Sequence, residues 1–124
     1  MNQSRLISDA QRKLPYYEGA NLSLPKFRKF LGATLSEFST LTNKSTRTLQ
    51  RHKFATAEMI KQLQPLLYSI SLLAEIAEAD EIKRWLHTPL KEWRGRSPMD
   101  ELTRGNLDGV LSLIERIRAG EGGY

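Results

Sequence analysis

The last forty residues of the chain, 85–124, contain helix stops so closely spaced that only short helices fit between them. Pro89 disfavours helical geometry in the residue before it, so a helix that carries Trp85 must end just ahead of this proline. Ser97-Pro98 then marks a helix start, because the serine can accept a backbone N–H and a proline in the first turn gives up no helical hydrogen bond. The loop between these points is polar, and Trp93 is its one residue large enough to act as an anchor.

A final helix is predicted after Gly105, since glycine accepts the left-handed conformation on which many helices end. Asn106 caps this helix and Gly120 ends it. Its apolar side chains recur at helical spacing on one face: Leu107, Val110, Leu111, Ile114 and Ile117. The segment cannot bury this face by itself, so the face must pack against the rest of the chain or against a partner.

Capping signals predict three further short helices nearer the N-terminus. Ser23-Leu24-Pro25 opens the first, and Gly32 ends it. Thr34 and Glu37 form a capping box at the start of the second helix. In this motif the side chain of each residue accepts a hydrogen bond from the backbone N–H of the other. Ser45 caps the third. The inward-facing residues of these helices are expected to be Phe27, Phe30, Leu31, Leu35, Phe38, Leu41 and Leu49.

A long helix is predicted from Ala57 toward Ala79, and Pro65 is expected to kink or break it. Residues 66–73 are apolar on more than one face, so we expect the closing helices and a second protomer to cover them. Asp80 caps the helix that leads to Trp85. No convincing strand is present in the sequence, and the predicted fold class is therefore all-α.

The pattern divides the chain into three parts. Residues 1–22 form an N-terminal arm, in which Pro15 interrupts a weak apolar face and Tyr16-Tyr17 indicates an irregular linker. Residues 23–64 form a helix-turn-helix bundle. Residues 65–124 form a small helical domain.

The second and third short helices have the spacing of a helix-turn-helix, and they resemble the Xre class of this unit. The second helix of such a unit lies in the major groove of DNA. Three of its side chains would face base edges, because they carry suitable donors and acceptors: Thr46, Arg47 and Gln50. Three basic residues would meet phosphates: Lys44, Arg51 and Lys53. The turn lacks the usual glycine and such units also serve dimerisation, so both interpretations stay open.

Positive charge is concentrated in the first half of the chain. Residues 1–64 contain 11 Lys and Arg against 4 Asp and Glu, a net charge of +7, whereas residues 65–124 contain 8 against 10, a net charge of −2. This asymmetry indicates different partners for the two halves, or it serves only solubility.

The composition argues against enzymes and metalloproteins. The chain has no cysteine, which excludes disulfides, and its two histidines, His52 and His87, lie in different halves. Carboxylates such as Asp100 and Glu101 are interpreted as caps and solvated helix faces. We therefore expect no catalytic site, cofactor or metal. The sequence has no export signal and no segment of the roughly 20 apolar residues that would cross a bilayer, so we expect a cytoplasmic protein without membrane contact.

One ordered series of residues in the second half of the chain is a more specific signal than charge or composition. It consists of Trp85-Leu86-x-x-Pro89, Gly95-Arg96-x-Pro98-x-Asp100-x-Leu102, Gly105, Gly109-Val110, Ile114 and Gly120. This pattern resembles the toxin-binding domain of the Xre/MbcA/ParS antitoxin family. Leu90 and Trp93 depart from it, at positions where asparagine and leucine are usual.

The resemblance implies an antitoxin of a type II toxin–antitoxin system. Such a protein would bind a RES-type toxin, which consumes NAD or transfers ADP-ribose from it, and would inhibit it by covering the NAD pocket. The resemblance also implies a hetero-oligomer with the toxin, a homodimer, and repression of the protein's own operon through operator DNA. The alternative is a stand-alone helix-turn-helix transcriptional regulator with a C-terminal dimerisation domain.

The toxin contacts are expected at Trp93, Arg94, Arg96, Arg104, Asn106, Glu121, Gly122, Gly123 and Tyr124. In this hypothesis the tail enters or borders the pocket, where Tyr124 stacks and Glu121 or the terminal carboxylate meets cationic groups. The other interpretation of a glycine-rich tail is a frayed end.

Overall fold

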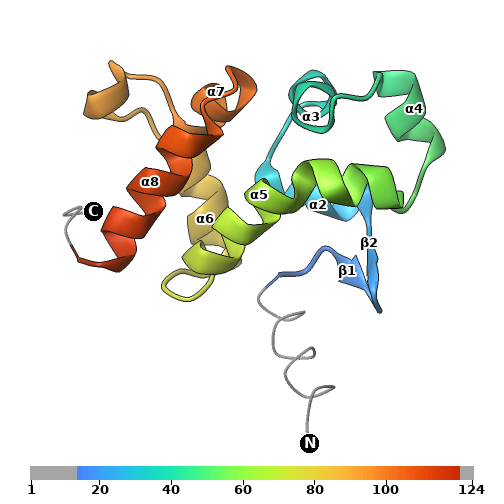
Figure 1. Cartoon of the computed structure of the whole chain (residues 1–124), viewed down its shortest axis with the longest axis horizontal. Coiled ribbons are helices and arrows are strands. Elements are labelled where there is room, and N and C mark those ends of the chain that lie inside the picture. The colour runs from blue at the N-terminus through green and yellow to red at the C-terminus, as the bar shows by residue number, and fades with distance from the viewer. Residues whose placement is uncertain (1–13, 121–124) are drawn as a thin grey trace, which may run out of the picture.

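The computed structural model describes residues 14–120, which fold as a helical bundle with one small hairpin (Figure 1). Its elements are β1 (Tyr17–Glu18), β2 (Asn21–Leu22), α2 (Leu24–Leu31), α3 (Leu35–Thr42), α4 (Thr46–Arg51), α5 (Ala57–Leu73), α6 (Ala79–Leu86), the 3-10 helix η1 (Lys91–Trp93), α7 (Pro98–Thr103) and α8 (Leu107–Arg118). The predicted all-α class is confirmed. The expectations for the arm residues 1–13 and for the tail residues 121–124 lie outside the described residues.

Helix α5 runs through the middle of the molecule, with α2, α3 and α4 toward one end and α6, α7 and α8 toward the other (Figure 1). It packs on both α3 and α8. The buried residues form one continuous cluster that includes Phe27 of α2, Leu63 and Ile70 of α5, and Ile114 of α8. Helix α5 also crosses the expected boundary between residues 64 and 65, so the two expected units share a helix and a core.

The predicted helix caps are present at most positions. The Thr34 hydroxyl accepts from the Glu37 backbone N–H at 3.0 Å, and the Glu37 carboxylate accepts from the Thr34 N–H at 2.8 Å. Ser45 and Asn106 cap α4 and α8 as predicted. The prediction for Asp80 was wrong, because Glu78 is the residue that caps α6 and Asp80 lies in the first turn.

Two predictions about helix extent also need correction. Helix α5 ends at Leu73 instead of continuing toward Ala79, and it continues through Pro65 without a break, so that a kink is the part of the Pro65 prediction that still stands. Pro65 is exposed, so the carbonyl group that loses its helical partner can be solvated. In α8 the fully buried residues are Val110, Leu113 and Ile114, and the predicted face had omitted Leu113.

The segment before α2 is part of the core, contrary to the irregular linker expected from Tyr16-Tyr17. Strands β1 and β2 pair antiparallel, and a bridge joins Ser23 to Phe54 beyond them. Tyr16 is only 1% exposed, and its ring centroid lies 4.7 Å from that of Phe27. Burial raises the pKa of the Tyr16 phenol above its ordinary value.

The two halves also meet between α6 and α2. Nε2 of His87 lies 2.8 Å from the carbonyl oxygen of Leu31, to which it donates a hydrogen bond. Gly32 follows with φ of 66°, and a Cβ at that position would lie 3.0 Å from the same nitrogen. Glycine is therefore favoured there both by the backbone conformation and by the approach of His87.

The apolar segment 66–73 is covered mostly by this chain's own helices. Tyr68 is the exception, since it is 54% exposed, whereas Leu66, Leu67, Ile70 and Leu73 are buried. A second protomer is therefore not required to cover most of this segment, and the homodimer stays a prediction.

The burial of Tyr16 leads to a stability prediction. Replacing Tyr16 with alanine removes a buried aromatic ring and should lower the free energy of unfolding by about 3–5 kcal/mol, measured from urea denaturation curves. Tyr68→Ala is the matched control, and it should change this free energy by less than about 1 kcal/mol because the side chain is already exposed. Equal effects of the two substitutions would contradict the placement of Tyr16 in the core.

Candidate partner-binding site

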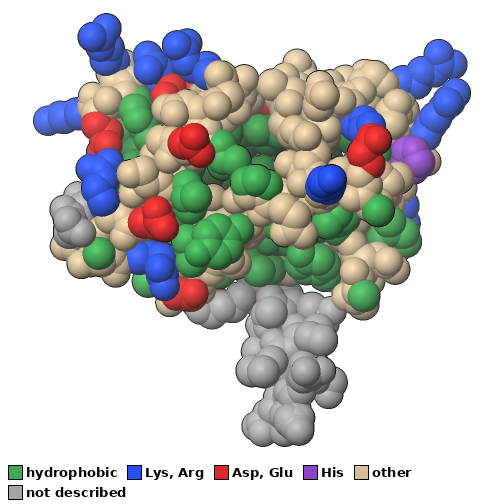
Figure 2. All heavy atoms as spheres, in the orientation of Figure 1, with side chains coloured by type: hydrophobic (Ala, Val, Ile, Leu, Met, Phe, Trp, Pro, Cys, Tyr) green, Lys and Arg blue, Asp and Glu red, His purple; other side chains and the backbone are tan. Residues whose placement is uncertain are grey.

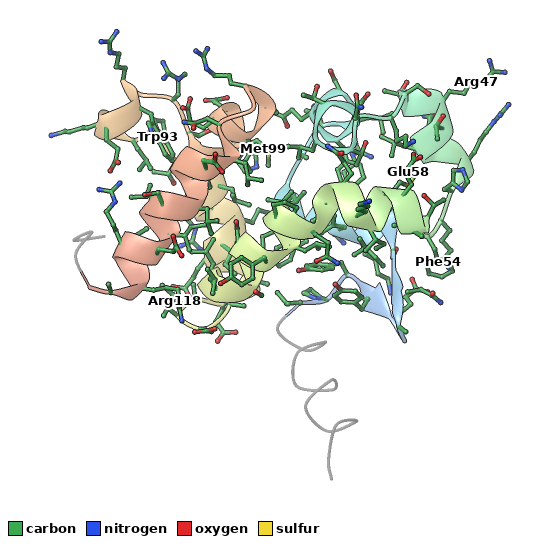
Figure 3. All side chains as sticks on the ribbon, in the orientation of Figure 1. Arg47, Phe54, Glu58, Trp93, Met99 and Arg118 are labelled. Atoms are coloured by element: carbon green, nitrogen blue, oxygen red, sulfur yellow. The ribbon has the colours of Figure 1, made fainter. Side chains whose placement is uncertain are left out.

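The loop between α6 and α7 is built around Leu90, which is 6% exposed. The Leu90 N–H donates to the carbonyl of Arg96 at 3.1 Å, and the Leu90 carbonyl accepts from the N–H of Gly95 at 2.9 Å. Leu90 is therefore a second anchor of this loop, beside Trp93, and the sequence pattern had not indicated it. Trp93 lies on η1, is partly buried and packs against the core (Figure 3).

Glu101 of α7 is the centre of this region and is only 3% exposed. Its carboxylate accepts from Nε of Arg96 at 2.6 Å and from Nδ2 of Asn106 at 2.8 Å, and Nε of Arg104 lies 3.7 Å away. The hydrogen bond from Arg96, followed by that from Asn106, holds the pKa of Glu101 below its ordinary value. The interpretation of Glu101 as a solvated carboxylate was therefore wrong.

The adjacent Asp100 is a helix cap, as the sequence analysis expected. Its carboxylate accepts from the Ser97 N–H at 2.9 Å, and the Ser97 hydroxyl accepts from the Asp100 N–H at 3.1 Å. The hydrogen bond from the Ser97 backbone lowers the pKa of Asp100. Neighbouring carboxylates on one helix thus have separate structural roles.

Asn106 connects α7 to α8. Its Nδ2 donates to Glu101, and its Oδ1 accepts from the N–H of Gly109 at 3.1 Å. A Cβ at position 109 would lie 2.6 Å from the Asn106 amide, so only glycine leaves room for this cap. Asn106 is therefore engaged within the chain.

The predicted toxin-contact residues within 14–120 gather on the loop, α7 and the start of α8. Arg94 is exposed in a left-handed conformation with φ of 56° and makes no ion pair with any described residue. Arg96 and Arg104 are held by Glu101 but keep 37% and 62% of their side chains exposed. Figure 2 shows Lys and Arg side chains gathered at the upper left, and the chain there is the orange segment of Figure 1 that contains η1. The predicted contacts Glu121, Gly122, Gly123 and Tyr124 lie outside the described residues.

An apolar hollow that the sequence analysis missed lies between α6 and the C-terminal ends of α5 and α8. Its apolar lining comprises Leu73, Ile76, Ala77, Ile82, Trp85 and Ile117. Ile76 is 51% exposed, and the buried Nε1 of Trp85 has no hydrogen-bond acceptor within the described part of the chain. The sequence contains one signal for this hollow, the apolar residue Ile76 just beyond the end of α5. Because the predicted helix extended toward Ala79, Ile76 was included in that helix. A nearby ion pair from Arg118 to Glu75, at 2.6 Å, ties α8 to the segment after α5 (Figure 3).

A second surface lies at the other end of the molecule, on α4. Thr46, Arg47, Gln50 and Arg51 are all exposed on this helix, and Figure 3 shows Arg47 pointing outward. Lys44 and Lys53 flank the helix but are engaged in ion pairs with Glu58 and Glu18. The structure thus brings together the six residues expected to face DNA, of which Lys44 and Lys53 form ion pairs within the described part of the chain.

The described residues contain no group of three or more His, Asp or Glu side chains that could hold a metal ion. His87 donates to a backbone carbonyl, and His52 caps the end of α4. Among the helices of residues 14–120, none is long and apolar enough to span a membrane.

Comparison with known proteins identifies the class of the C-terminal part. Residues 72–120 match the sequence profile described as the antitoxin Xre/MbcA/ParS C-terminal toxin-binding domain. The loop, the Glu101 cluster and the apolar hollow all fall within this range. These residues therefore belong to that toxin-binding domain family, and the resemblance inferred from the sequence pattern is confirmed.

One solved structure supports the same fold over a longer stretch. It is a chain of the M. tuberculosis MbcT–MbcA toxin–antitoxin complex, with a TM-score of 0.54 and 24% sequence identity, and the match covers 78% of this chain and 91% of that one. At 24% sequence identity, this match is evidence for a shared fold alone. No curated protein sequence is similar enough to this chain to count as a match.

The Glu101 cluster predicts a specific pH dependence. A carboxyl whose pKa is lowered by folding stabilises the protein above its ordinary pKa of about 4.5, and this stabilisation is lost as the pH falls through the lower folded value. Glu101→Gln should therefore reduce the melting temperature by several degrees at neutral pH. The difference from the unmodified protein should narrow as the pH falls below about 4.5.

Glu115→Gln, on the exposed side of α8, is the control for this measurement and should show no such narrowing. A difference for Glu101→Gln that stays constant across the acid range would show that the carboxylate charge does not stabilise the cluster.

Proposed function

We propose that this protein is an antitoxin that binds and inhibits a RES-type toxin, which consumes NAD or transfers ADP-ribose from it. The observation that carries the proposal is the membership of residues 72–120 in a toxin-binding domain family. The shared fold with a chain of a toxin–antitoxin complex is in agreement with it. In this proposal the antitoxin acts by covering the NAD pocket of the toxin.

Two features of the domain suit a protein partner. The first is the cationic rim formed by Arg94, Arg96 and Arg104, of which the last two are fixed in direction by the buried Glu101. A rim of this kind favours an acidic surface on the partner and speeds encounter with it. The second is the apolar hollow at Ile76 and Trp85, because exposed apolar surface beside polar groups is typical of interaction sites.

The other predicted contacts are assigned to the same interface. Trp93 is partly buried on η1 beside the cationic rim, so it can add apolar area at the edge of the contact. Asn106 contributes by holding the rim in place through Glu101. The segment from Glu121 to Tyr124 is proposed to reach the NAD pocket, which a truncation after Gly120 would test by its effect on toxin neutralisation.

Charge reversal at Arg94 tests the rim. Arg94→Glu should weaken the complex with the RES-type protein encoded beside this chain by about fivefold or more, because one attractive rim charge becomes repulsive. The measurement is titration calorimetry of the purified partners, together with rescue of growth when both are expressed. Lys61→Glu, a reversal at an exposed position of α5, should leave both unchanged. If both variants weakened the complex equally, the cationic rim would not be part of the interface.

A second candidate function, for which α4 provides the observation, is binding of operator DNA. Arg47, Gln50 and Arg51 are exposed on one short helix that follows a tight turn, and residues 1–64 carry a net charge of +7. Arginine and glutamine can form paired hydrogen bonds with guanine and adenine edges. We therefore propose that the protein also represses its own operon, with recognition through a homodimer.

The DNA candidate predicts selective loss at Arg47. Arg47→Ala should weaken binding to the upstream DNA of the operon by about tenfold or more at low salt, and it should leave toxin binding unchanged. Arg94→Glu provides the reciprocal control, since it should affect toxin binding and not DNA binding. No affinity of the unmodified protein for its upstream DNA at low salt would remove this function.

Co-purification separates the antitoxin proposal from the alternative of a stand-alone transcriptional regulator. An antitoxin made together with the neighbouring toxin carries it as a stable complex and relieves its toxicity. A regulator with a C-terminal dimerisation domain purifies alone and requires residues 65–124 for DNA binding.

A further inference from the structure

The basic residues around α4 fall into two groups. Some form an ion pair with a carboxylate of the same chain, and the others do not. Arg47 and Arg51 make no ion pair with any described residue. Lys44, immediately before the cap of α4, contacts the carboxylate of Glu58. Lys53, two residues after the end of α4, lies 3.4 Å from the carboxylate of Glu18. Both ends of the helix are thus flanked by a lysine that has an acidic partner within the chain.

Glu58 comes from the first turn of α5 and reaches back to Lys44, which precedes α4. Figure 3 shows Glu58 between α5 and α4, on the inner side of the helix that carries the outward-pointing Arg47. The Glu58 side chain is 73% exposed and that of Lys44 is 30% exposed, so solvent and ions reach the pair. The contact with Lys44 lowers the pKa of Glu58, and the carboxylate is therefore ionised at neutral pH.

Glu18 lies on β1 and contacts two lysines. Its carboxylate is 3.0 Å from Nζ of Lys26 and 3.4 Å from Nζ of Lys53, and its side chain is 30% exposed. Nζ of Lys53 also lies 5.2 Å from the centre of the Phe54 ring. Backbone hydrogen bonds fix the geometry, because the Leu24 N–H donates to the Lys53 carbonyl at 2.8 Å. Glu18 therefore holds Lys53 on the β1 side of the molecule.

Few carboxylates are present in the described N-terminal half of the chain. Within the described part of residues 1–64 the carboxylates are Glu18, Glu37 and Glu58. Glu37 is used by the capping box of α3, and the remaining two each neutralise a lysine beside α4. A phosphate group and a carboxylate compete for the same ammonium group, since both are anionic acceptors of its hydrogen bonds.

We infer that Glu18 and Glu58 act as internal competitors of phosphate, which weaken the attraction of the α4 surface for DNA in general and leave the exposed Thr46, Arg47 and Gln50 to supply the preference for particular sequences. The inference rests on the DNA-binding candidate described above, and it adds two residues that no motif of the sequence had assigned. Its consequence is that Lys44 and Lys53 contribute less to binding in the unmodified protein than their positions suggest.

Removing each carboxylate tests the competition. Glu58→Gln and Glu18→Gln should each raise the affinity for a random-sequence DNA duplex by about fivefold at low salt, because a lysine is released to contact phosphate and a repulsive carboxylate is removed. The logarithm of affinity should also fall more steeply with the logarithm of salt, by up to about one unit for each lysine released. Fluorescence anisotropy of the labelled duplex measures both quantities. Glu115→Gln on α8 makes the same change in net charge far from α4 and is the control.

A double-mutant cycle identifies the lysine concerned. Lys44→Gln should have little effect on DNA affinity in the unmodified protein and should abolish the gain in the Glu58→Gln background. Equal gains for Glu58→Gln and Glu115→Gln would show that only net charge matters. An equal cost of Lys44→Gln in both backgrounds would show that Glu58 does not occupy Lys44. Either result overturns the inference.

The same measurements separate this inference from the functions on which it rests. If the unmodified protein binds DNA and the two Glu→Gln substitutions change nothing, the competition is absent and the DNA function stands. If no form binds DNA even at low salt, the DNA function fails and the inference fails with it. Toxin binding is unaffected by either outcome. Melting temperatures of all variants verify that each one is folded.

Discussion

The structure depends on the burial of helix α5 between two groups of helices. Met59 and Leu63 are buried in its first half, Ile70 and Leu73 are buried in its second half, and the helix contacts both α3 and α8. A helix that is apolar on several faces needs packing partners on several sides, and for residues 66–73 this chain supplies most of them. One rigid element therefore connects the part of the chain that resembles a DNA-binding unit to the part that belongs to a toxin-binding domain family.

This arrangement places the two candidate surfaces at opposite ends of α5, as the positions of Arg47 and Trp93 in Figure 3 show. Each surface combines fixed cations with internal carboxylates, but in different ways. Glu101 is buried and directs Arg96 and Arg104, so it supports the cationic rim. Glu18 and Glu58 are more exposed and occupy lysines beside α4, so phosphate can compete with them. Burial decides whether a carboxylate organises a basic surface or attenuates it.

The sequence predicted those features that depend on residues three or four positions apart. The capping box of Thr34 with Glu37, the cap at Ser97 and the short helices between the stops are local features, and their prediction was correct. The hairpin that buries Tyr16, the role of Glu101 and the apolar hollow at Ile76 depend on contacts between distant segments, so periodicity and capping could not indicate them. For the candidate site, the resemblance indicated the segment that matches the toxin-binding domain family, but it did not distinguish Arg94, which is exposed, from Asn106, which is engaged internally.

In the proposed function, the surface formed by residues 72–120 covers the NAD pocket of a toxin. NAD consumption by the purified neighbouring toxin, followed during titration with this protein, tests that proposal. We expect consumption to fall to zero at a fixed molar ratio, and the point of complete inhibition to shift to higher protein concentration for Arg94→Glu. Unchanged NAD consumption in the presence of excess folded protein would show that this protein does not cover the pocket.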